Sequence, residues 1–382
     1  MTNNERRERR YIRRQEKRKN KKRDKEVLSY EDVFSISNLN NAFYSCKRNT
    51  NWKASVQSFG ANLPIEVGSS HRELMNETWR SSGFRHFIIK ERGKQREIRS
   101  VTIGERVVQK CFCDNYLVDL LSSNLIYDNG ASLKGKGTKF ALLRLEKHLK
   151  DFYFTNGSNN GYIVVYDFSS YFANIDHDIL YSIADKFMED EKCKKLYHYL
   201  IDCFDEGLGL GSQVSQISAV LFPNQLDHAM KDRYGYKYYA RYMDDGYVIV
   251  KDKKEAELCQ KRIMEECKKL NIIINPKKFK IHKIDRCFVW LKKRIFLTNT
   301  GGVIIRPSKN TVTRERRRLK KLAKKLEQGK IPYKDIECSY MSWRGDIIKN
   351  YKCVYHIIHN MDKLYNKLFI EPLINGVENY GY

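Results

Sequence analysis

Residues 239–250 read Tyr-Ala-Arg-Tyr-Met-Asp-Asp-Gly-Tyr-Val-Ile-Val, so two adjacent carboxylates interrupt an apolar and aromatic run. The flanking residues are typical of two short strands, and Asp245-Gly246 is a hairpin-turn signal, which places the acidic pair at a hairpin tip. Adjacent carboxylates repel each other, and burying them without compensation costs several kcal/mol. A divalent cation is the usual compensation, whereas a solvated turn, which also favours Asp, is the simpler alternative.

A third carboxylate follows another strand pattern. Residues 162–166 are β-branched and aromatic, as in a buried strand, and Asp167 ends the run. If this strand lies beside the hairpin, Asp167, Asp244 and Asp245 converge on one point. Hard oxygen ligands suit Mg²⁺, and two such ions about 4 Å apart can activate an attacking hydroxyl and stabilise leaving pyrophosphate. Taken alone, Asp167 would more simply cap a helix.

Together these motifs resemble the reverse transcriptase family. Residues 242–245 (Tyr-Met-Asp-Asp) are similar letter for letter to its catalytic box, and Phe172, five residues after Asp167, stands where the family excludes ribonucleotides. The resemblance implies an α+β fold, a right-hand polymerase with fingers, palm and thumb, an antiparallel palm sheet and a helical thumb. It also implies two Mg²⁺ ions, with Mn²⁺ as a substitute, held by Asp167, Asp244, Asp245 and the backbone of Phe168.

The resemblance covers most of the chain in the family's order. Lys90 and Arg96 lie in a stretch, residues 88–108, that resembles the fingers segment binding the incoming triphosphate, a task suited to cationic side chains. Residues 275–279 resemble the motif whose lysine, here Lys278, protonates the leaving pyrophosphate as a general acid. A surface lysine in a basic loop is an equal alternative for Lys278.

Residues 208–216 resemble the nucleotide-binding loop of the palm, with a departure. Leu210 and Gln216 stand where most relatives have Gln and Pro, and Leu210 cannot hydrogen-bond a ribose as Gln can. This variant resembles reverse transcriptases of diversity-generating retroelements, in which an aliphatic residue here accompanies error-prone copying of template adenines. Related forms occur among antiviral-defence enzymes. The predicted dNTP-binding residues are Lys90, Arg96, Phe172, Leu210, Gly211 and Gln216.

The formal net charge is +26 over 382 residues, which predicts long-range attraction to polyanions with steep salt dependence. A membrane surface is an alternative partner, but the sequence has no long apolar run and no signal peptide. The ten cysteines form no C-x-x-C pair, so we expect a reducing cytoplasm. Phe288 and Trp290 resemble the primer grip, although the family usually has Gly at the latter position. The predicted nucleic-acid contacts are Tyr242, Met243, Phe288, Trp290, Arg314, Arg317 and Lys321.

Patterning along the chain predicts four regions. They are a basic arm (1–26), either mobile or ordered by RNA, the fingers (27–160), the palm (161–300) and a helical thumb (301–382). We expect palm strands at 161–167, 237–243, 246–251 and 287–297. We expect palm helices at 177–189, with Asp176 as its cap, and at 215–231.

The resemblance therefore implies an RNA-directed DNA polymerase that makes cDNA by two-metal nucleotidyl transfer, with Asp167, Asp244, Asp245 and Lys278 as catalytic residues. Its expected partners are an RNA template, a DNA or RNA primer, dNTPs, and a structured noncoding RNA or a small basic accessory protein, but no membrane. A diversity-generating retroelement is the first interpretation of its role. An antiviral-defence enzyme that copies a dedicated noncoding RNA, a template-independent nucleotidyl transferase, and a catalytically idle RNA-binding protein on the same scaffold stay open.

Overall fold

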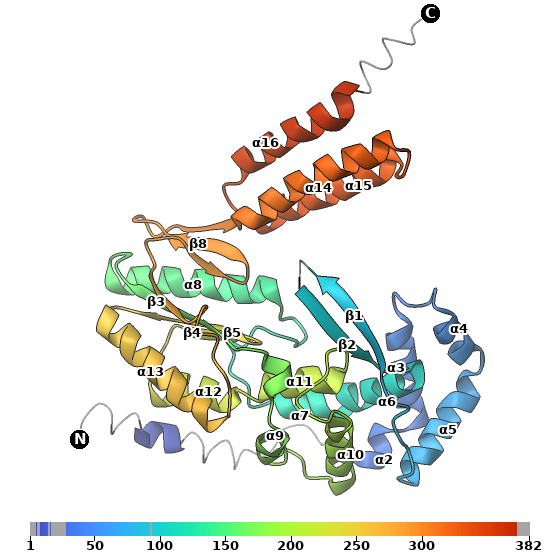
Figure 1. Ribbon diagram of the computed structural model, residues 1–382. Coiled ribbons are helices and arrows are strands. Elements are labelled where there is room, and N and C mark those ends of the chain that lie inside the picture. Colours follow the sequence, from blue (N-terminus) through green and yellow to red (C-terminus); the bar gives the residue numbers. More distant parts are fainter. Residues whose placement is uncertain (1–4, 6–7, 14–15, 17–27, 92–93, 373–382) are drawn as a thin grey trace, which may run out of the picture. The chain divides into compact units, whose positions relative to one another are not determined.

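The computed structural model describes residues 5, 8–13, 16, 28–91 and 94–372 (Figure 1). The chain divides into two compact units, each assembled from separate stretches of sequence. Unit 1 comprises Met1–Ala141, Tyr166–Val248 and Glu257–Lys280, and unit 2 comprises Leu142–Val165, Ile249–Ala256 and Ile281–Tyr382. The predicted catalytic residues all belong to unit 1.

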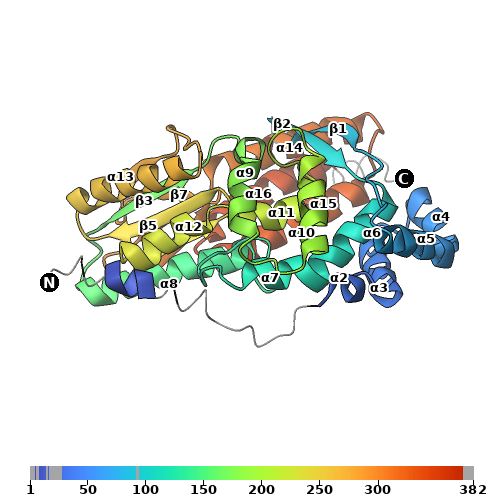
Figure 2. The same ribbon diagram turned by 90° about the horizontal axis from the view of Figure 1, so that it is seen from below.

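Unit 1 is mainly helical. Side chains placed by the sequence cap its helices: Ser35 accepts a hydrogen bond from the Asn38 amide, and Thr102 accepts one from the Glu105 amide. Helix α11 contacts α7, α9 and α10, and Figure 2 shows these helices gathered together. The helices are α2 (Tyr30–Val33), α3 (Ile36–Lys47), α4 (Ala54–Ala61), α5 (Leu63–Met75), α6 (Ile103–Phe112), α7 (Val118–Ser122), α9 (His177–Ala184), α10 (Glu191–Asp202), α11 (Gln213–Leu221) and α12 (Asn224–His228).

The strands form three sheets. A two-stranded antiparallel ribbon pairs β1 (Arg85–Glu91) with β2 (Lys94–Ser100). A four-stranded sheet has the order β4-β5-β3-β6, made of β4 (Tyr239–Tyr242), β5 (Asp245–Val250), β3 (Tyr162–Asp167) and β6 (Lys280–Lys283). An antiparallel three-stranded sheet contains β7 (Phe288–Trp290), β8 (Lys293–Leu297) and β9 (Val303–Pro307).

The strand predictions at 161–167, 237–243 and 246–251 are confirmed by β3, β4 and β5. The prediction of one strand over 287–297 is wrong, because β7 and β8 form a hairpin there. Its two turn residues, Leu291 and Lys292, have φ angles of 46° and 62°. Positive φ at both positions matches the twist of a two-residue hairpin loop.

The two predicted palm helices are shorter than expected. Asp176 caps α9 as predicted, since its Oδ1 accepts a hydrogen bond of 3.0 Å from the Ile179 amide, but the helix ends at Ala184. The expected helix over 215–231 is interrupted at Pro223, where α11 has ended and α12 begins. Proline has no amide hydrogen and restricts the residue before it, so it interrupts a continuous helix.

The C-terminal part of unit 2 is a group of three helices, α14 (Lys309–Glu327), α15 (Tyr333–Asn350) and α16 (Tyr355–Tyr365), seen together in Figure 1. Leu319, Ile336 and Met361 lie in its buried core. Beside that core the Asp362 carboxylate accepts hydrogen bonds from the Tyr340 hydroxyl, at 2.6 Å, and from Arg344 Nε, at 3.0 Å. Within the described residues no helix is both long enough and apolar enough to span a bilayer.

Two further helices, α8 (Thr138–Asn156) and α13 (Lys253–Lys269), contribute residues to both units. Most of the predicted basic arm at 1–26 lies outside the described residues. Residues 8–13 are helical, and the Glu8 carboxylate pairs with Arg233 Nε at 3.1 Å.

Candidate active site

The acidic pair lies at the tip of the β4–β5 hairpin. Tyr242 pairs with Asp245, so Met243, with a φ of 53°, and Asp244 form the two-residue turn. The prediction that Asp245-Gly246 forms the turn is therefore wrong, because Asp245 already begins β5. Position 246 requires glycine because of close packing: a Cβ atom there would lie 2.1 Å from Cζ of the Tyr166 ring.

A buried hydrogen-bond network supports this turn from below. Both Arg241 and Asp227 have fully buried side chains, and the guanidinium donates to the two carboxylate oxygens at 2.8 and 2.6 Å. Arg241 Nη1 also donates to the Met243 carbonyl at 2.9 Å. The Tyr239 hydroxyl donates to Asp227 at 2.5 Å, and the Tyr166 and Tyr239 hydroxyls are 2.8 Å apart. The carbonyl that precedes Asp244 is thus fixed by a satisfied network.

Sequence reasoning missed Arg241 and Asp227 as site residues. An arginine inside an apolar strand signals a buried partner, because an unpaired buried charge is unstable. The sequence does not say which of its 46 acidic residues supplies that partner.

Asp167 is 4% exposed and reaches the hairpin through the end of β3. The Phe168 amide donates to the Asp244 carbonyl at 3.2 Å, so the two acidic segments are joined by backbone. On its other side, the Asn275 amide donates to the Asp167 carbonyl at 2.8 Å, and Asn275 Nδ2 lies 3.4 Å from Asp167 Oδ1. The structure therefore brings Asp167 and Asp244 together, with Asn275 as a positioning neighbour that the sequence did not indicate.

Lys278 joins the same group of side chains. Its ammonium forms a salt bridge with Asp167 Oδ2. Partial burial lowers the pKa of Lys278, but the hydrogen bond to Asp167 and the nearby charges of Asp245 and Asp244 outweigh it, so the pKa lies above its ordinary value. The lysine is therefore protonated at neutral pH, as a general acid must be before it acts.

The three carboxylates repel one another. Burial raises the pKa of Asp245 to about 7, and the charges of Asp244 and Asp167 add to the effect. Burial, and then the charge of Asp167, also raise the pKa of Asp244, while Lys278 and Arg96 oppose the shift. Both effects disfavour the ionised carboxylates, and a cation bound between them would stabilise the ionised forms.

The donor set fits a divalent cation. Among the described residues, no group of three or more His, Cys, Asp or Glu side chains is arranged to hold a metal ion, and Asp167 is bound by the Lys278 ammonium. The oxygens are nevertheless those that Mg²⁺ prefers, and a divalent charge would relieve the repulsion that raises the pKa of Asp245. Asp167, Asp244, Asp245 and the Phe168 carbonyl are the groups that would hold it.

The predicted nucleotide loop is tied to both Phe172 and β2. The Leu208 amide donates to the Phe172 carbonyl at 2.7 Å, and the Arg99 amide donates to the Leu210 carbonyl at 3.1 Å. Gly211 has a φ of 122°, and a Cβ atom there would lie 2.9 Å from the Arg99 carbonyl, so this close approach requires glycine. Phe172 and Leu210 are half-buried, whereas Gln216 is exposed.

Lys90 and Arg96 lie on opposite faces of the β1–β2 ribbon. Arg96 pairs with Ile89 and Lys90 pairs with Gln95, and successive side chains of a strand alternate between faces. Both cations are exposed, but only Arg96 contributes to the electrostatics of Asp244. Arg96 is thus linked to the carboxylates, while triphosphate binding by either residue stays a prediction.

The predicted nucleic-acid contacts are spread over both units. In unit 1 the Tyr242 hydroxyl accepts a hydrogen bond of 3.3 Å from Thr138. In unit 2 the rings of Phe288 and Trp290 are buried, and Val289, 54% exposed, is the side chain of β7 that faces solvent. The α14 side chains predicted to bind nucleic acid are all exposed, and they are Arg314, Arg317 and Lys321.

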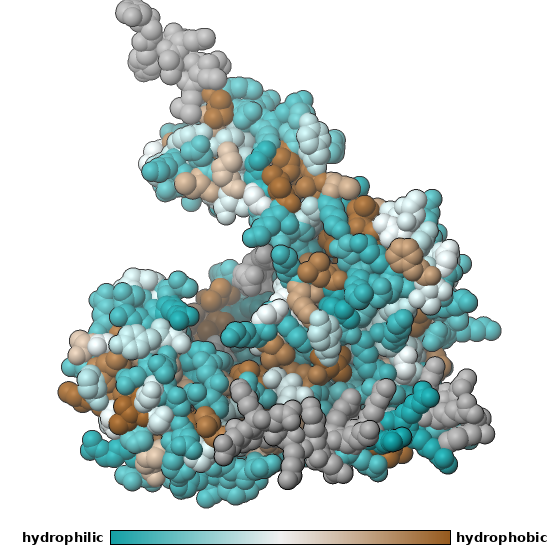
Figure 3. All heavy atoms as spheres, turned by 180° about the vertical axis from the view of Figure 1, so that it is seen from behind, coloured by the Kyte–Doolittle hydropathy of each residue, from teal (hydrophilic) through white to brown (hydrophobic). Residues whose placement is uncertain are grey.

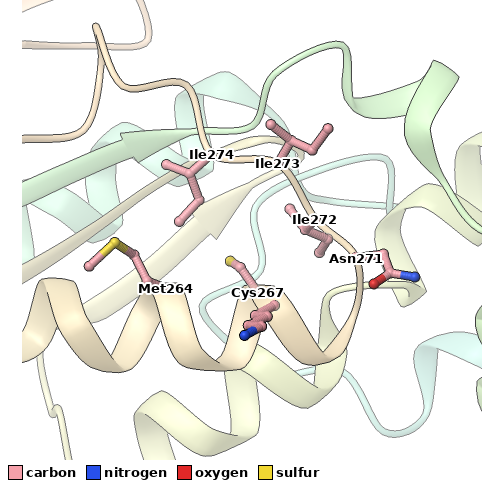
Figure 4. A pocket seen from close by; sticks show the side chains of 7 residues that line it. Met264, Cys267, Asn271, Ile272, Ile273 and Ile274 are labelled. Atoms are coloured by element: carbon pink, nitrogen blue, oxygen red, sulfur yellow. The ribbon is translucent and has the colours of Figure 1, made fainter.

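Unit 1 also has a surface hollow of about 420 Å³ between α13 and residues 271–274. Met264 and Cys267 project from the helix toward Ile272 and Ile274 (Figure 4). No carboxylate lines this hollow, so it is distinct from the predicted site.

Residues 88–317 match the family described as "Reverse transcriptase (RNA-dependent DNA polymerase)". No curated protein matches the sequence significantly. Solved structures with a similar chain trace include apo telomerase from Candida tropicalis. For the form truncated of its C-terminal domain, the identity is 16% and the TM-score 0.46, and the match covers 58% of this chain and 54% of that one. For the other form, the identity is 13% and the TM-score 0.46, and the match covers 64% of this chain and 53% of that one. Telomerase from Candida albicans in complex with a fragment of telomeric RNA is similar at 8% identity and a TM-score of 0.47, covering 60% and 46%. The chain spans about half of the length of these proteins.

Replacing Asp245 with Asn should stabilise the metal-free protein at neutral and alkaline pH. The pKa of this carboxyl group is about 7 in the folded protein and roughly 4 in the unfolded chain. The folded protein therefore loses stability as the pH rises between these values. The reason is that the unfolded chain ionises first. With a chelator present, the melting temperature should fall less for the variant than for the natural protein as the pH rises through this window, and Mg²⁺ should raise it more in the natural protein.

The matched control is Asp205→Asn, which removes an exposed carboxylate elsewhere in unit 1. It should keep the pH dependence of the natural protein. Identical pH profiles for Asp245→Asn and the natural protein would contradict the repulsion described above.

Proposed function

Because the chain belongs to the reverse transcriptase (RNA-dependent DNA polymerase) family, whose match spans more than half of its length, we propose that it extends a primer on an RNA template with deoxynucleotides. Its α+β, right-hand polymerase fold is that of the family. The observation that carries the proposal is the convergence of Asp167 with Asp244 and Asp245, which lie 77 and 78 positions further along the chain.

Asp167, Asp244, Asp245 and the Phe168 carbonyl would hold two divalent ions, Mg²⁺ with Mn²⁺ as a substitute. When bound, such ions supply activation of the 3′-hydroxyl and neutralisation of the charge on the departing pyrophosphate. The buried network at Arg241 holds the turn that carries Asp244, and Asn275 orients Asp167. The protein's own contribution is thus the fixed position of its carboxylates.

Lys278 and Arg96 would act on the phosphates of the nucleotide. As the 3′-hydroxyl gives its proton to solvent and its oxygen bonds to the α-phosphorus, the bond between that phosphorus and the bridging oxygen to the β-phosphate breaks. The leaving pyrophosphate takes a proton from Lys278, whose raised pKa keeps it protonated in the free site. Arg96, whose charge lowers the pKa of Asp244, would bind the triphosphate. Lys90 lies on the other face of the ribbon.

Phe172 and the loop at 208–216 would select the nucleotide. The Phe172 ring would exclude a 2′-hydroxyl, and the hydrogen bond between its carbonyl and the Leu208 amide fixes its distance from the loop. Leu210 offers no side-chain donor or acceptor to the sugar or the base pair. A weaker constraint on pairing geometry would follow.

We further propose that the enzyme serves a diversity-generating retroelement, with template RNA, a primer and a small basic accessory protein as its partners. Leu210, in place of the usual Gln, is the residue that favours mutagenic copying. An antiviral-defence role with a dedicated noncoding RNA uses the same chemistry. The neighbouring DNA separates the two, because a template repeat and a variable target gene would mark the diversity-generating element.

The variant Asp244→Asn should lose nucleotide incorporation by at least about a hundredfold, since a neutral amide is a poor ligand for the metal ions that carry the charge of the transition state. Its affinity for primer–template should stay near that of the natural protein. Primer extension with Mg²⁺ and a filter-binding titration measure the two quantities, and Asp205→Asn serves as a control for both. Turnover comparable to the natural enzyme would disprove the metal assignment.

Leu210→Gln should raise fidelity opposite template adenines, because the amide can hydrogen-bond the nucleotide sugar and support pairing geometry. Sequencing of cDNA made on one defined RNA gives the error spectrum. Leu210→Met, which changes shape without adding a hydrogen-bonding amide, is the matched control. An unchanged error rate at adenines in Leu210→Gln would reject the mutagenic role of this position.

A further inference from the structure

Two large aromatic side chains are exposed near the turn between α3 and α4: Trp52 lies in the turn and Tyr44 in α3. Trp52 is 76% exposed and Tyr44 is 56% exposed. Both lie before residue 88, where the match to the reverse transcriptase family begins, and none of the roles described above includes them. Exposed tryptophan is uncommon unless a partner covers it.

The turn is held in one conformation by hydrogen bonds. Trp52 Nε1 donates to the Asn49 carbonyl at 3.3 Å, and the Thr50 hydroxyl donates to the Cys46 carbonyl at 2.8 Å. Gln57 Nε2 donates to the Asn51 carbonyl at 3.0 Å. The indole is therefore anchored through its N–H, while most of its surface stays accessible to solvent.

The support beneath the turn is apolar and buried. The Phe43 and Phe59 rings, from α3 and α4, stack with centroids 5.3 Å apart and are 1% and 6% exposed. The turn therefore projects from a packed helix pair, and substitution of its outward side chains removes no core contact.

The sequence that forms the turn carries charge of one sign. Between Asp32 and Glu66 the sequence contains no acidic residue, and its three cations are Lys47, Arg48 and Lys53, all close to Trp52 in sequence. Lys53 Nζ lies 5.5 Å from the centroid of the Trp52 ring. Lys53 occupies the N-cap position of α4 but makes no side-chain cap hydrogen bond there. An aromatic face beside cations is the arrangement that binds single-stranded nucleic acid.

Polar side chains beside the indole favour nucleic acid as the partner. The lower left of Figure 3, in the region of α3, α4 and α5, shows a hydrophilic surface interrupted by several apolar groups. Exposed Asn49 and Asn51 beside the indole offer amide donors and acceptors of the kind that bind base edges.

We propose that the Trp52 turn, consisting of Lys47, Arg48, Trp52 and Lys53, binds an unpaired segment of RNA. A base stacks on the indole and the adjacent phosphates meet the cations. An unpaired strand is required, because a base within a duplex does not offer its face to a side chain. The choice of RNA over DNA rests on the proposed function, since the template is RNA; the choice of a single strand does not.

The test compares two substrates that share one primer–template duplex. One is blunt, and the other carries an unpaired RNA tail of about 12 nucleotides, within the range of strand lengths that stacking platforms bind. Affinities are measured for the full chain by fluorescence anisotropy. Trp52→Ala should weaken binding of the tailed substrate by at least about fivefold, as loss of one base stack does, and leave the blunt substrate unchanged. Trp52→Phe should recover most of the loss.

Lys53→Gln should reduce the salt dependence of tailed binding by about one counterion. Ile65→Ala is the matched control, because Ile65 is 73% exposed on the neighbouring α5 but carries no adjacent cation; it should bind both substrates normally. Equal affinity of Trp52→Ala and the natural protein for the tail would overturn the proposal, and so would a loss of equal size in Ile65→Ala. A natural protein that prefers a DNA tail of the same sequence would overturn RNA as the occupant.

Failure of this proposal is distinguishable from failure of the proposed function. Primer extension needs an unpaired template base, so it is measured on the same duplex with a single templating RNA nucleotide in place of the tail, and Trp52→Ala should extend this primer at the natural rate. Tail binding that depends on Trp52 in a chain without extension activity would retain the RNA site and reject the polymerase. Extension without a Trp52-dependent tail contact would retain the polymerase and reject the RNA site.

Discussion

The ion pair between Asp227 and Arg241 is the interaction on which the site depends. Both side chains are fully buried, and the guanidinium also donates to the carbonyls of Met243 and Val220. Such a pair is tolerated in the interior only when its hydrogen bonds are satisfied, and loss of one partner costs about 3–5 kcal/mol. Since the network fixes the residue before Asp244, the position of this turn depends on the ion pair that joins α12 to β4 and not on the turn sequence alone.

The site places negative charges where they are unfavourable for the fold. Burial and mutual repulsion raise the pKa values of Asp244 and Asp245, and Lys278 offsets the repulsion only in part. Such an arrangement is expected where function and not stability sets the side chains. The same carboxylates that destabilise the free protein would provide the proposed affinity for divalent cations, which would make metal binding and stability linked properties of this hairpin.

How much could be predicted depends on the range of the interactions. Strands β3, β4 and β5 follow from local patterns, and so does the meeting of Asp167 with the hairpin once the family resemblance is used. The acidic pair lies at the hairpin tip as expected, but Gly246 is not a turn residue: it lies in β5, where its small size accommodates the Tyr166 ring of another strand. The β7–β8 turn, Leu291-Lys292, carries no Gly or Asn to signal it. Pro223, by contrast, is a local signal: a proline inside the helix expected over 215–231 indicates the break between α11 and α12.

The most direct test of the central claim is to locate the metal ions. Anomalous diffraction from Mn²⁺ in crystals of the chain with primer–template and a non-hydrolysable dNTP should show two ions about 4 Å apart. Each should lie about 2.0–2.3 Å from carboxylate oxygens, with Asp167 and Asp244 as shared ligands and the Phe168 carbonyl on one ion. Manganese bound elsewhere, with these carboxylates still paired to Lys278 in the presence of the nucleotide, would contradict the account.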